Sequence, residues 1–211
     1  MQGVSKTASE SLKCKEGAVS PLLALLYHHR SVVMHAIVES GLACTESDGH
    51  WQLLVLGCGL DTSYEERFAG RAGVDVFQVD LPEVMAKREV ESPSAISADL
   101  RKIDSLEKGM KKAGFCFSTP TVVLTEMVLN YLPTPAMHSL LSFLSSTLRD
   151  QALFVSYDLV LPSPPSSFAR AILDKFAERG APLLSVQEGR TAQRRLFRRH
   201  GWHKCRAISM Q

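Results

Sequence analysis

The feature that most constrains the fold is the stretch 53–62, which reads Leu-Leu-Val-Leu-Gly-Cys-Gly-Leu-Asp-Thr. Its four apolar residues predict a buried parallel strand, and Gly57 and Gly59 predict a tight turn that opens a helix. Because glycine has no Cβ, the backbone of this turn can adopt unusual dihedral angles and lie close against a ligand. Asp61 and Thr62 suit the start of the helix. The stretch is typical of the cofactor-binding turn of a Rossmann-like sheet.

The spacing of the glycines narrows the kind of cofactor. The pattern Gly-x-Gly-x-Asp lacks the third glycine of the dinucleotide fingerprint. A pyrophosphate ligand is therefore less favoured than a smaller adenosyl ligand without phosphate, such as S-adenosylmethionine. Asp80 follows the next apolar stretch, about 20 residues after Gly59, where a carboxylate can accept hydrogen bonds from both ribose hydroxyls. The plainer alternatives are an ordinary strand–helix turn and an Asp80 that caps the helix beginning at Pro82.

Acidic residues also end later predicted strands. Asp99 lies in a short strand over 95–100, and Glu126 ends the strongly β-prone stretch 120–126. Because the carboxyl ends of parallel strands meet at one edge of a sheet, these acids and Asp80 are expected to share a cleft. Asp99 would accept from an adenine amino group with Leu100 against the ring, and Glu126 would lie near a cationic group. Any one of these acids alone could instead be a helix cap.

The alternation of strands and helices predicts an α/β fold with a doubly wound, mostly parallel sheet. We expect a single domain over residues 1–211, with a helical lid segment in 1–50 and the cofactor-binding core in 51–211. The remaining expected strands are 51–56, 74–79, 152–158 and 207–210. The expected helices are 21–39, 64–72, 82–91, 105–113, 135–148, 168–179 and 191–199.

Composition excludes several classes of function. The net charge of +2 does not call for a polyanionic partner, and no apolar run reaches the roughly 18 residues that span a membrane. The five cysteines form no C-x-x-C pair, which predicts reduced thiols, as in the cytosol or nucleus, and we expect a cytoplasmic protein. The seven histidines lack the spacing of metal ligands, so we expect no metal site.

Several stretches together resemble the leucine carboxyl methyltransferase family, whose members use S-adenosylmethionine. The matching stretches are 56–62, 79–84, 98–101, 120–132, 152–158 and 193–202. The resemblance implies a class I S-adenosylmethionine-dependent methyltransferase fold. It also implies cofactor contacts by position: Gly57 and Gly59 shape the turn, Asp80 holds the ribose, Asp99 and Leu100 contact the adenine, and Glu126 faces the methionine part.

Two further site residues come from the resemblance alone. Lys15 matches the family's lysine-containing entry segment, which closes over the site, and Arg30 matches an arginine that pairs with a carboxylate of the cofactor. The family usually has about twenty more residues between these two segments. The chain also stops at Gln211, before the family's last helix and closing strands, so we expect a C-terminally truncated form.

The implied reaction is methyl transfer to the C-terminal leucine carboxylate of a type 2A protein phosphatase catalytic subunit. It requires positioning and exclusion of water, with no catalytic side chain and no metal. The first alternative within the family is the tRNA wybutosine-synthesising methyltransferase. A basic helix face containing Arg194, Arg195, Arg198 and Arg199 suits that alternative, although a solvated charged face is the simpler interpretation. The second alternative is a truncated protein that binds cofactor or phosphatase without turnover.

Overall fold

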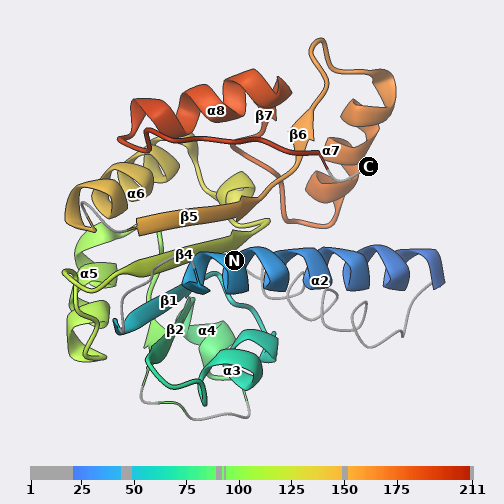
Figure 1. Cartoon of the computed structure of the whole chain (residues 1–211). Coiled ribbons are helices and arrows are strands. Elements are labelled where there is room, and N and C mark those ends of the chain that lie inside the picture. Colours follow the sequence, from blue (N-terminus) through green and yellow to red (C-terminus); the bar gives the residue numbers. More distant parts are fainter. Residues whose placement is uncertain (1–20, 44–48, 89–91, 93, 149–151, 210–211) are drawn as a thin grey trace.

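A five-stranded parallel sheet forms the centre of the computed structural model, which describes residues 21–43, 49–88, 92, 94–148 and 152–209 (Figure 1). The strand order is β3-β2-β1-β4-β5. From β1 the chain builds outward through β2 to β3, then returns to the other side of β1 for β4 and β5. The order therefore reverses between β1 and β4, and ligands of such sheets bind at the carboxyl ends of the strands beside that reversal. The strands are β1 (Trp51–Leu56), β2 (Val74–Asp80), β3 (Ala95–Ser97), β4 (Thr121–Glu126) and β5 (Ala152–Tyr157).

Helices cover both faces of the sheet, as Figure 1 shows. One face packs against α2 (Pro21–Ala43) and α3 (Ser63–Phe68), and the other against α5 (Ile103–Lys112), α6 (Thr134–Thr147) and α8 (Gly189–Arg199). The remaining elements lie around the carboxyl edge of the sheet. These are α4 (Pro82–Met85), η1 (Leu129–Tyr131), α7 (Ser167–Glu178) and a small parallel pair, β6 (Val160–Leu161) with β7 (Gln187–Glu188).

The apolar runs of the strands explain this two-sided cover. Successive side chains of a strand point to opposite faces. In β1, Leu53 belongs to the cluster that packs on α2 and α3, whereas Leu54 and Leu56 belong to the cluster on α5, α6 and α8. All three are fully buried. Burying one such side chain stabilises the fold by about 1.5–3 kcal/mol, so a strand that is apolar throughout needs helices on both sides.

The predicted α/β class, the parallel sheet and the positions of β1, β2, β4 and β5 are confirmed. Three elements end three or more residues earlier than predicted. β3 ends at Ser97, α3 ends at Phe68 before the turn through Gly70 and Gly73, and α4 ends at Met85. The prediction of a strand over 207–210 is wrong for 207–209, which pair with no strand of the described chain and leave Ile208 exposed. The division into a lid segment and a core stays a prediction.

Among the described residues, none of the helices has both the length and the apolar character needed to cross a bilayer.

Candidate functional site

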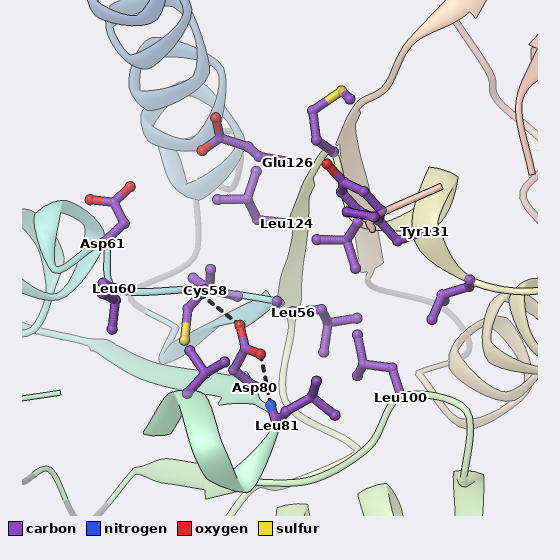
Figure 2. A pocket seen from close by; sticks show the side chains of 18 of the residues that line it. Leu56, Cys58, Leu60, Asp61, Asp80, Leu81, Leu100, Leu124, Glu126 and Tyr131 are labelled. Carbon is purple, nitrogen blue, oxygen red and sulfur yellow. Dashed lines mark hydrogen bonds between the residues drawn. The ribbon is translucent and has the colours of Figure 1, made fainter. Parts of the chain in front are cut away.

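A cavity of about 360 Å³ opens at the carboxyl ends of β1, β2 and β4. It brings together all the sequence-predicted site residues that the structure describes. Lys15 lies outside the described residues. Figure 2 shows the two ends of the cavity, with Asp80 beneath the glycine turn and Glu126 beside α2. The predicted residues that line it are Arg30, Gly57, Gly59, Asp80, Asp99, Leu100 and Glu126.

The glycine turn forms the floor of the cavity. Gly57 and Gly59 have φ values of 66° and 60°, a region that residues with a Cβ rarely adopt. At Gly57 there is also no room for a side chain, because an added Cβ would lie 2.4 Å from Cγ2 of Val128. The turn is tied to β2 by a hydrogen bond from Gly57 N to the carbonyl oxygen of Val79 at 2.7 Å. Glycine is therefore required at position 57 by conformation and by space.

Asp80 is held by backbone donors on both sides of the crevice (Figure 2). Gly59 N donates to Oδ2 and Leu81 N donates to Oδ1, each at 2.7 Å. Only 9% of the residue is exposed. Burial raises the pKa of the Asp80 carboxyl, while the two N–H donors and the nearby Arg88 oppose that rise. Each carboxylate oxygen can accept more than one hydrogen bond, so Asp80 keeps acceptor capacity toward the cavity.

Asp99 lies along the same edge, just beyond β3, and is paired differently. The guanidinium of Arg101 forms a bidentate ion pair with the Asp99 carboxylate, with Nε at 2.8 Å from Oδ1 and Nη2 at 2.7 Å from Oδ2. These hydrogen bonds keep the pKa of Asp99 below its usual value. Leu100 is buried and contributes to the cavity wall. Asp99 can therefore accept a hydrogen bond from the edge of a flat ring, while Leu100 packs against the face of that ring.

Glu126 ends β4 and is held by side chains from α2 and α3. Tyr64 donates its hydroxyl proton to Oε1 at 2.6 Å, and Arg30 Nε lies 2.9 Å from Oε2. The Arg30 contact is an ion pair without the alignment of a hydrogen bond, so Nε and Oε2 keep unused hydrogen-bonding capacity among the described residues. Burial, with Glu126 as neighbour, raises the pKa of Tyr64, so the hydroxyl stays protonated as a donor.

Aromatic rings fix the position of Arg30. Its guanidinium carbon lies 4.7 Å from the ring centroid of Tyr27 and 5.3 Å from that of Tyr157. Contacts of this kind stabilise a cation by about 0.5–2 kcal/mol each, depending on desolvation. The Arg30 side chain is only 12% exposed. The Arg30–Glu126 pair therefore presents one positive and one negative group at the same end of the cavity.

The wall on the far side of the cavity is apolar and comes from the part of the chain that follows β4. It contains Tyr131, Phe176 and the segment 180–184. Asn130 holds this segment in place: its carbonyl oxygen accepts from Leu184 N at 2.7 Å, and its Oδ1 accepts from Leu159 N at 2.7 Å. Asn130 is itself buried, so these bonds stabilise the wall in a region closed to water.

Several residues of this site were not identified from the sequence. Tyr64 and the wall residues belong to no sequence motif that marks them as part of a cleft, and they line the cavity only through the packing of the elements that carry them. Met127 follows Glu126 directly and has a φ of 59°, which is unusual for a residue with a side chain. Arg88 packs behind the glycine turn. An arginine shortly after a cofactor-turn acid is the one weak signal that could have drawn attention to it.

The described part of the chain contains no group of three or more His, Cys, Asp or Glu side chains placed to hold a metal ion. Cys58 lines the cavity, but burial raises the pKa of its thiol to about 12. The thiol is therefore protonated at neutral pH and is a poor nucleophile there.

The family model described as leucine carboxyl methyltransferase matches residues 15–145. Among curated relatives, human tRNA wybutosine-synthesizing protein 4 is 29% identical over 191 residues, which is 75% of this chain but 27% of that protein. Leucine carboxyl methyltransferase 1 of Caenorhabditis elegans is 24% identical and is covered over 71% of its length by 98% of this chain. The chain thus spans about a quarter of one relative and most of the other.

Among solved structures, a methyltransferase candidate from Thermobifida fusca superposes with a TM-score of 0.61 at 17% sequence identity. The match covers 93% of this chain and 72% of that protein. At this identity the likeness concerns the fold.

Proposed function

Because the chain belongs to the leucine carboxyl methyltransferase family, an S-adenosylmethionine-dependent family, we propose that it methylates a carboxylate. We propose as acceptor the C-terminal leucine carboxylate of a type 2A protein phosphatase catalytic subunit, methylated in the cytoplasm. The observation that carries the proposal is the single cavity that contains the glycine turn, Asp80 and the Arg30–Glu126 pair.

The residues of the cavity suit the three parts of S-adenosylmethionine. Asp80 accepts the ribose hydroxyls, in hydrogen bonds that contribute about 1.5–3 kcal/mol each because the acceptor is charged. Gly57 and Gly59 let the backbone approach the adenosyl group closely. Asp99 accepts from the adenine amino group while Leu100 packs against the ring.

The amino-acid part of the cofactor carries one ammonium and one carboxylate. Glu126 receives the ammonium and Arg30 receives the carboxylate, using the hydrogen-bonding capacity that Oε2 and Nε leave unused in the ion pair. Lys15 closes over the cofactor, as the family pattern implies. The charges of ligand and site are therefore matched in pairs, which reduces the free energy lost on desolvating them.

The proposed reaction requires little acid–base chemistry from the protein. When bound, S-adenosylmethionine supplies a sulfonium-activated methyl group, which a carboxylate oxygen can accept with neutralisation of both charges. The acceptor is already ionised at neutral pH, so no side chain has to remove a proton. The residues of this chain align the two groups and exclude water, and Tyr131, Phe176 and 180–184 form the apolar wall beside which the acceptor lies. Such alignment contributes up to about 7–11 kcal/mol.

The direct test is incubation of the protein with methyl-labelled S-adenosylmethionine and either a type 2A phosphatase catalytic subunit or tRNA. We expect base-labile label on the phosphatase, and none on a phosphatase lacking its C-terminal leucine. Label on tRNA with none on the phosphatase would reject the proposed acceptor. Calorimetric binding of S-adenosylhomocysteine without product from either acceptor would instead indicate a non-catalytic binder.

One observation favours tRNA as a second candidate acceptor. The exposed face of α8 carries Arg194, Arg195, Arg198 and Arg199, and none of them forms an ion pair with a described residue. Like charges four residues apart on a helix are destabilising by about 0.2–0.5 kcal/mol per pair, so a polyanion that neutralised them would be favoured there. For this candidate we expect tRNA affinity that falls steeply with salt and falls again in Arg194→Gln/Arg198→Gln.

A further inference from the structure

The cofactor turn is supported from behind by an arginine that does not line the cavity. Arg88 lies just after α4, and its side chain is only 2% exposed. A guanidinium is among the groups least often buried, because its charge loses hydration unless many partners replace the water. The partners of Arg88 therefore indicate what its burial accomplishes.

Those partners lie mainly in the glycine turn. Nη1 donates to the carbonyl oxygens of Gly59 and Asp61, each at 3.0 Å, and lies 3.5 Å from Sγ of Cys58. On the opposite side of the turn, the N–H of Gly59 donates to Asp80. The turn is thus held between a buried cation on its carbonyl side and a buried carboxylate on its amide side.

Two more contacts tie Arg88 to the elements on either side of the turn. Nη2 donates to the carboxylate of Glu65 in α3 at 3.4 Å and to Oε1 of Gln78 in β2. Gln78 is itself buried in the sheet. One guanidinium therefore joins β2, the turn and α3, and its rigid planar fork can satisfy these acceptors together.

Arg88 also affects the charge of the ribose-binding carboxylate. Burial raises the pKa of Asp80, and the neighbouring acid Glu83 raises it further, whereas Arg88 and the two backbone donors lower it. Arg88 thus helps to keep Asp80 ionised, the form that accepts two ribose hydroxyls.

We propose that Arg88 is a positioning residue for the cofactor: from behind the glycine turn it fixes the backbone that contacts the adenosyl group and the carboxylate that holds the ribose. The inference rests on the proposed S-adenosylmethionine site, but it does not depend on which acceptor is methylated.

The test measures the affinity of purified protein for S-adenosylhomocysteine by calorimetry, together with the thermal midpoint of unfolding without ligand. Arg88→Met removes the charge and the donors, and we expect the Kd to rise at least about tenfold. Arg88→Lys keeps the charge but lacks the planar guanidinium, so its Kd should lie between that of the wild type and that of Arg88→Met. The matched control is Arg67→Met, since Arg67 in α3 pairs with Glu39, is 51% exposed and does not line the cavity.

A pH series separates positioning from simple stabilisation. Removal of Arg88 raises the pKa of Asp80, so the loss of S-adenosylhomocysteine affinity on acidification should begin at a higher pH in Arg88→Met than in the wild type. An arginine that merely stabilised the fold would lower the thermal midpoint and leave both the Kd of the folded protein and its pH profile unchanged, and that result would overturn the proposal.

If Arg88→Met does not fold, a milder variant tests the positioning role of Arg88. Glu65→Gln leaves Arg88 in place but removes the charge of the carboxylate with which it forms an ion pair, and we expect a Kd increase of about threefold. An unchanged Kd in both Glu65→Gln and Arg88→Lys would also reject the role of Arg88. If the wild type itself fails to bind S-adenosylhomocysteine, the proposed function fails, which is a different outcome from wild-type binding that Arg88 variants leave intact.

Discussion

Asp80 and Glu126 are both acids at strand ends, yet the molecule holds them by different means. Asp80 accepts two backbone N–H groups, from Gly59 and from its own neighbour Leu81. Glu126 depends on the side chains of Tyr64 and Arg30, which come from the helices α3 and α2. The position of Asp80 therefore follows from the path of two adjacent strands, whereas that of Glu126 requires α2 and α3 to be docked. The two ends of the cavity should respond differently to mutation and to the choice of ligand.

The largest effect is expected at Asp80. Asp80→Ala removes the acceptor for both ribose hydroxyls, which corresponds to about 3–6 kcal/mol and to at least a hundredfold loss of S-adenosylhomocysteine affinity. The loss should be equally large for 5′-methylthioadenosine, which keeps the ribose but lacks the amino-acid part. Calorimetry with both ligands measures this. Asp75→Asn is the control, because Asp75 lies at the other end of β2 and pairs with His50 at the surface; wild-type affinity in Asp80→Ala would refute the assignment.

The next effect concerns the turn itself. Gly57→Ala combines a strained φ of 66° with a Cβ placed 2.4 Å from Val128, so we expect a loss of about 2–4 kcal/mol in the free energy of unfolding. Gly114→Ala is a matched control, because its φ is 84° but a Cβ there would meet nothing within 4 Å. Urea denaturation of both variants isolates the steric part. Val128→Ala in the Gly57→Ala background should recover some of the loss, and equal losses at the two glycines would contradict the steric argument.

A smaller and more selective effect is expected at Glu126. Glu126→Gln keeps the shape of the side chain but removes the charge that would meet the ammonium, so S-adenosylhomocysteine affinity should fall about tenfold. Affinity for 5′-methylthioadenosine should be unchanged, since that ligand has no ammonium. A loss for S-adenosylhomocysteine alone, compared with the loss for both ligands in Asp80→Ala, would show that the two ends of the cavity bind different parts of the cofactor. Equal losses for both ligands would show that Glu126 acts on the whole cavity rather than on the amino-acid part.

The smallest effect on ligand binding is expected at Asp158, a further acid just after β5 that does not line the cavity. Burial raises its pKa from 3.8 to about 6, opposed by donors from Ser156 and Gln193. A carboxyl with a raised native pKa binds protons more readily in the folded state, so its contribution to stability is lost as pH rises from about 4 to 6. At about 1.4 kcal/mol per pKa unit, Asp158→Asn should therefore be about 3 kcal/mol more stable than the wild type at pH 7 and no more stable at pH 4.

Urea titrations at the two pH values measure this difference. Because Asp158 lies outside the cavity, the affinity of Asp158→Asn for S-adenosylhomocysteine should equal that of the wild type. A variant that is less stable at pH 7 would show that the ionised carboxylate makes a net favourable contribution there, contrary to the direction of its pKa shift.

Local patterns were sufficient for much of the fold and for one end of the site. The apolar run before Gly57 predicts β1, and the position of Asp80 after the next apolar run predicts its place in the site. Both predictions depend on residues that are adjacent in the chain. The error over 207–209 has the opposite origin. Ile208 has a β-branched side chain that is common in strands, but a strand also needs a partner for its backbone hydrogen bonds, and local preference does not supply one.

The sequence by itself determined the order of strands and helices, the glycine turn and the row of acids, since each is encoded by neighbouring residues. The tertiary structure alone decided that Tyr64 and Arg30 meet Glu126, that Asn130 fixes the apolar wall, and that Arg88 reaches behind the turn. The physical reason is that these contacts join residues from different elements, so they exist only once helices have docked on both faces of the sheet and excluded water from between them.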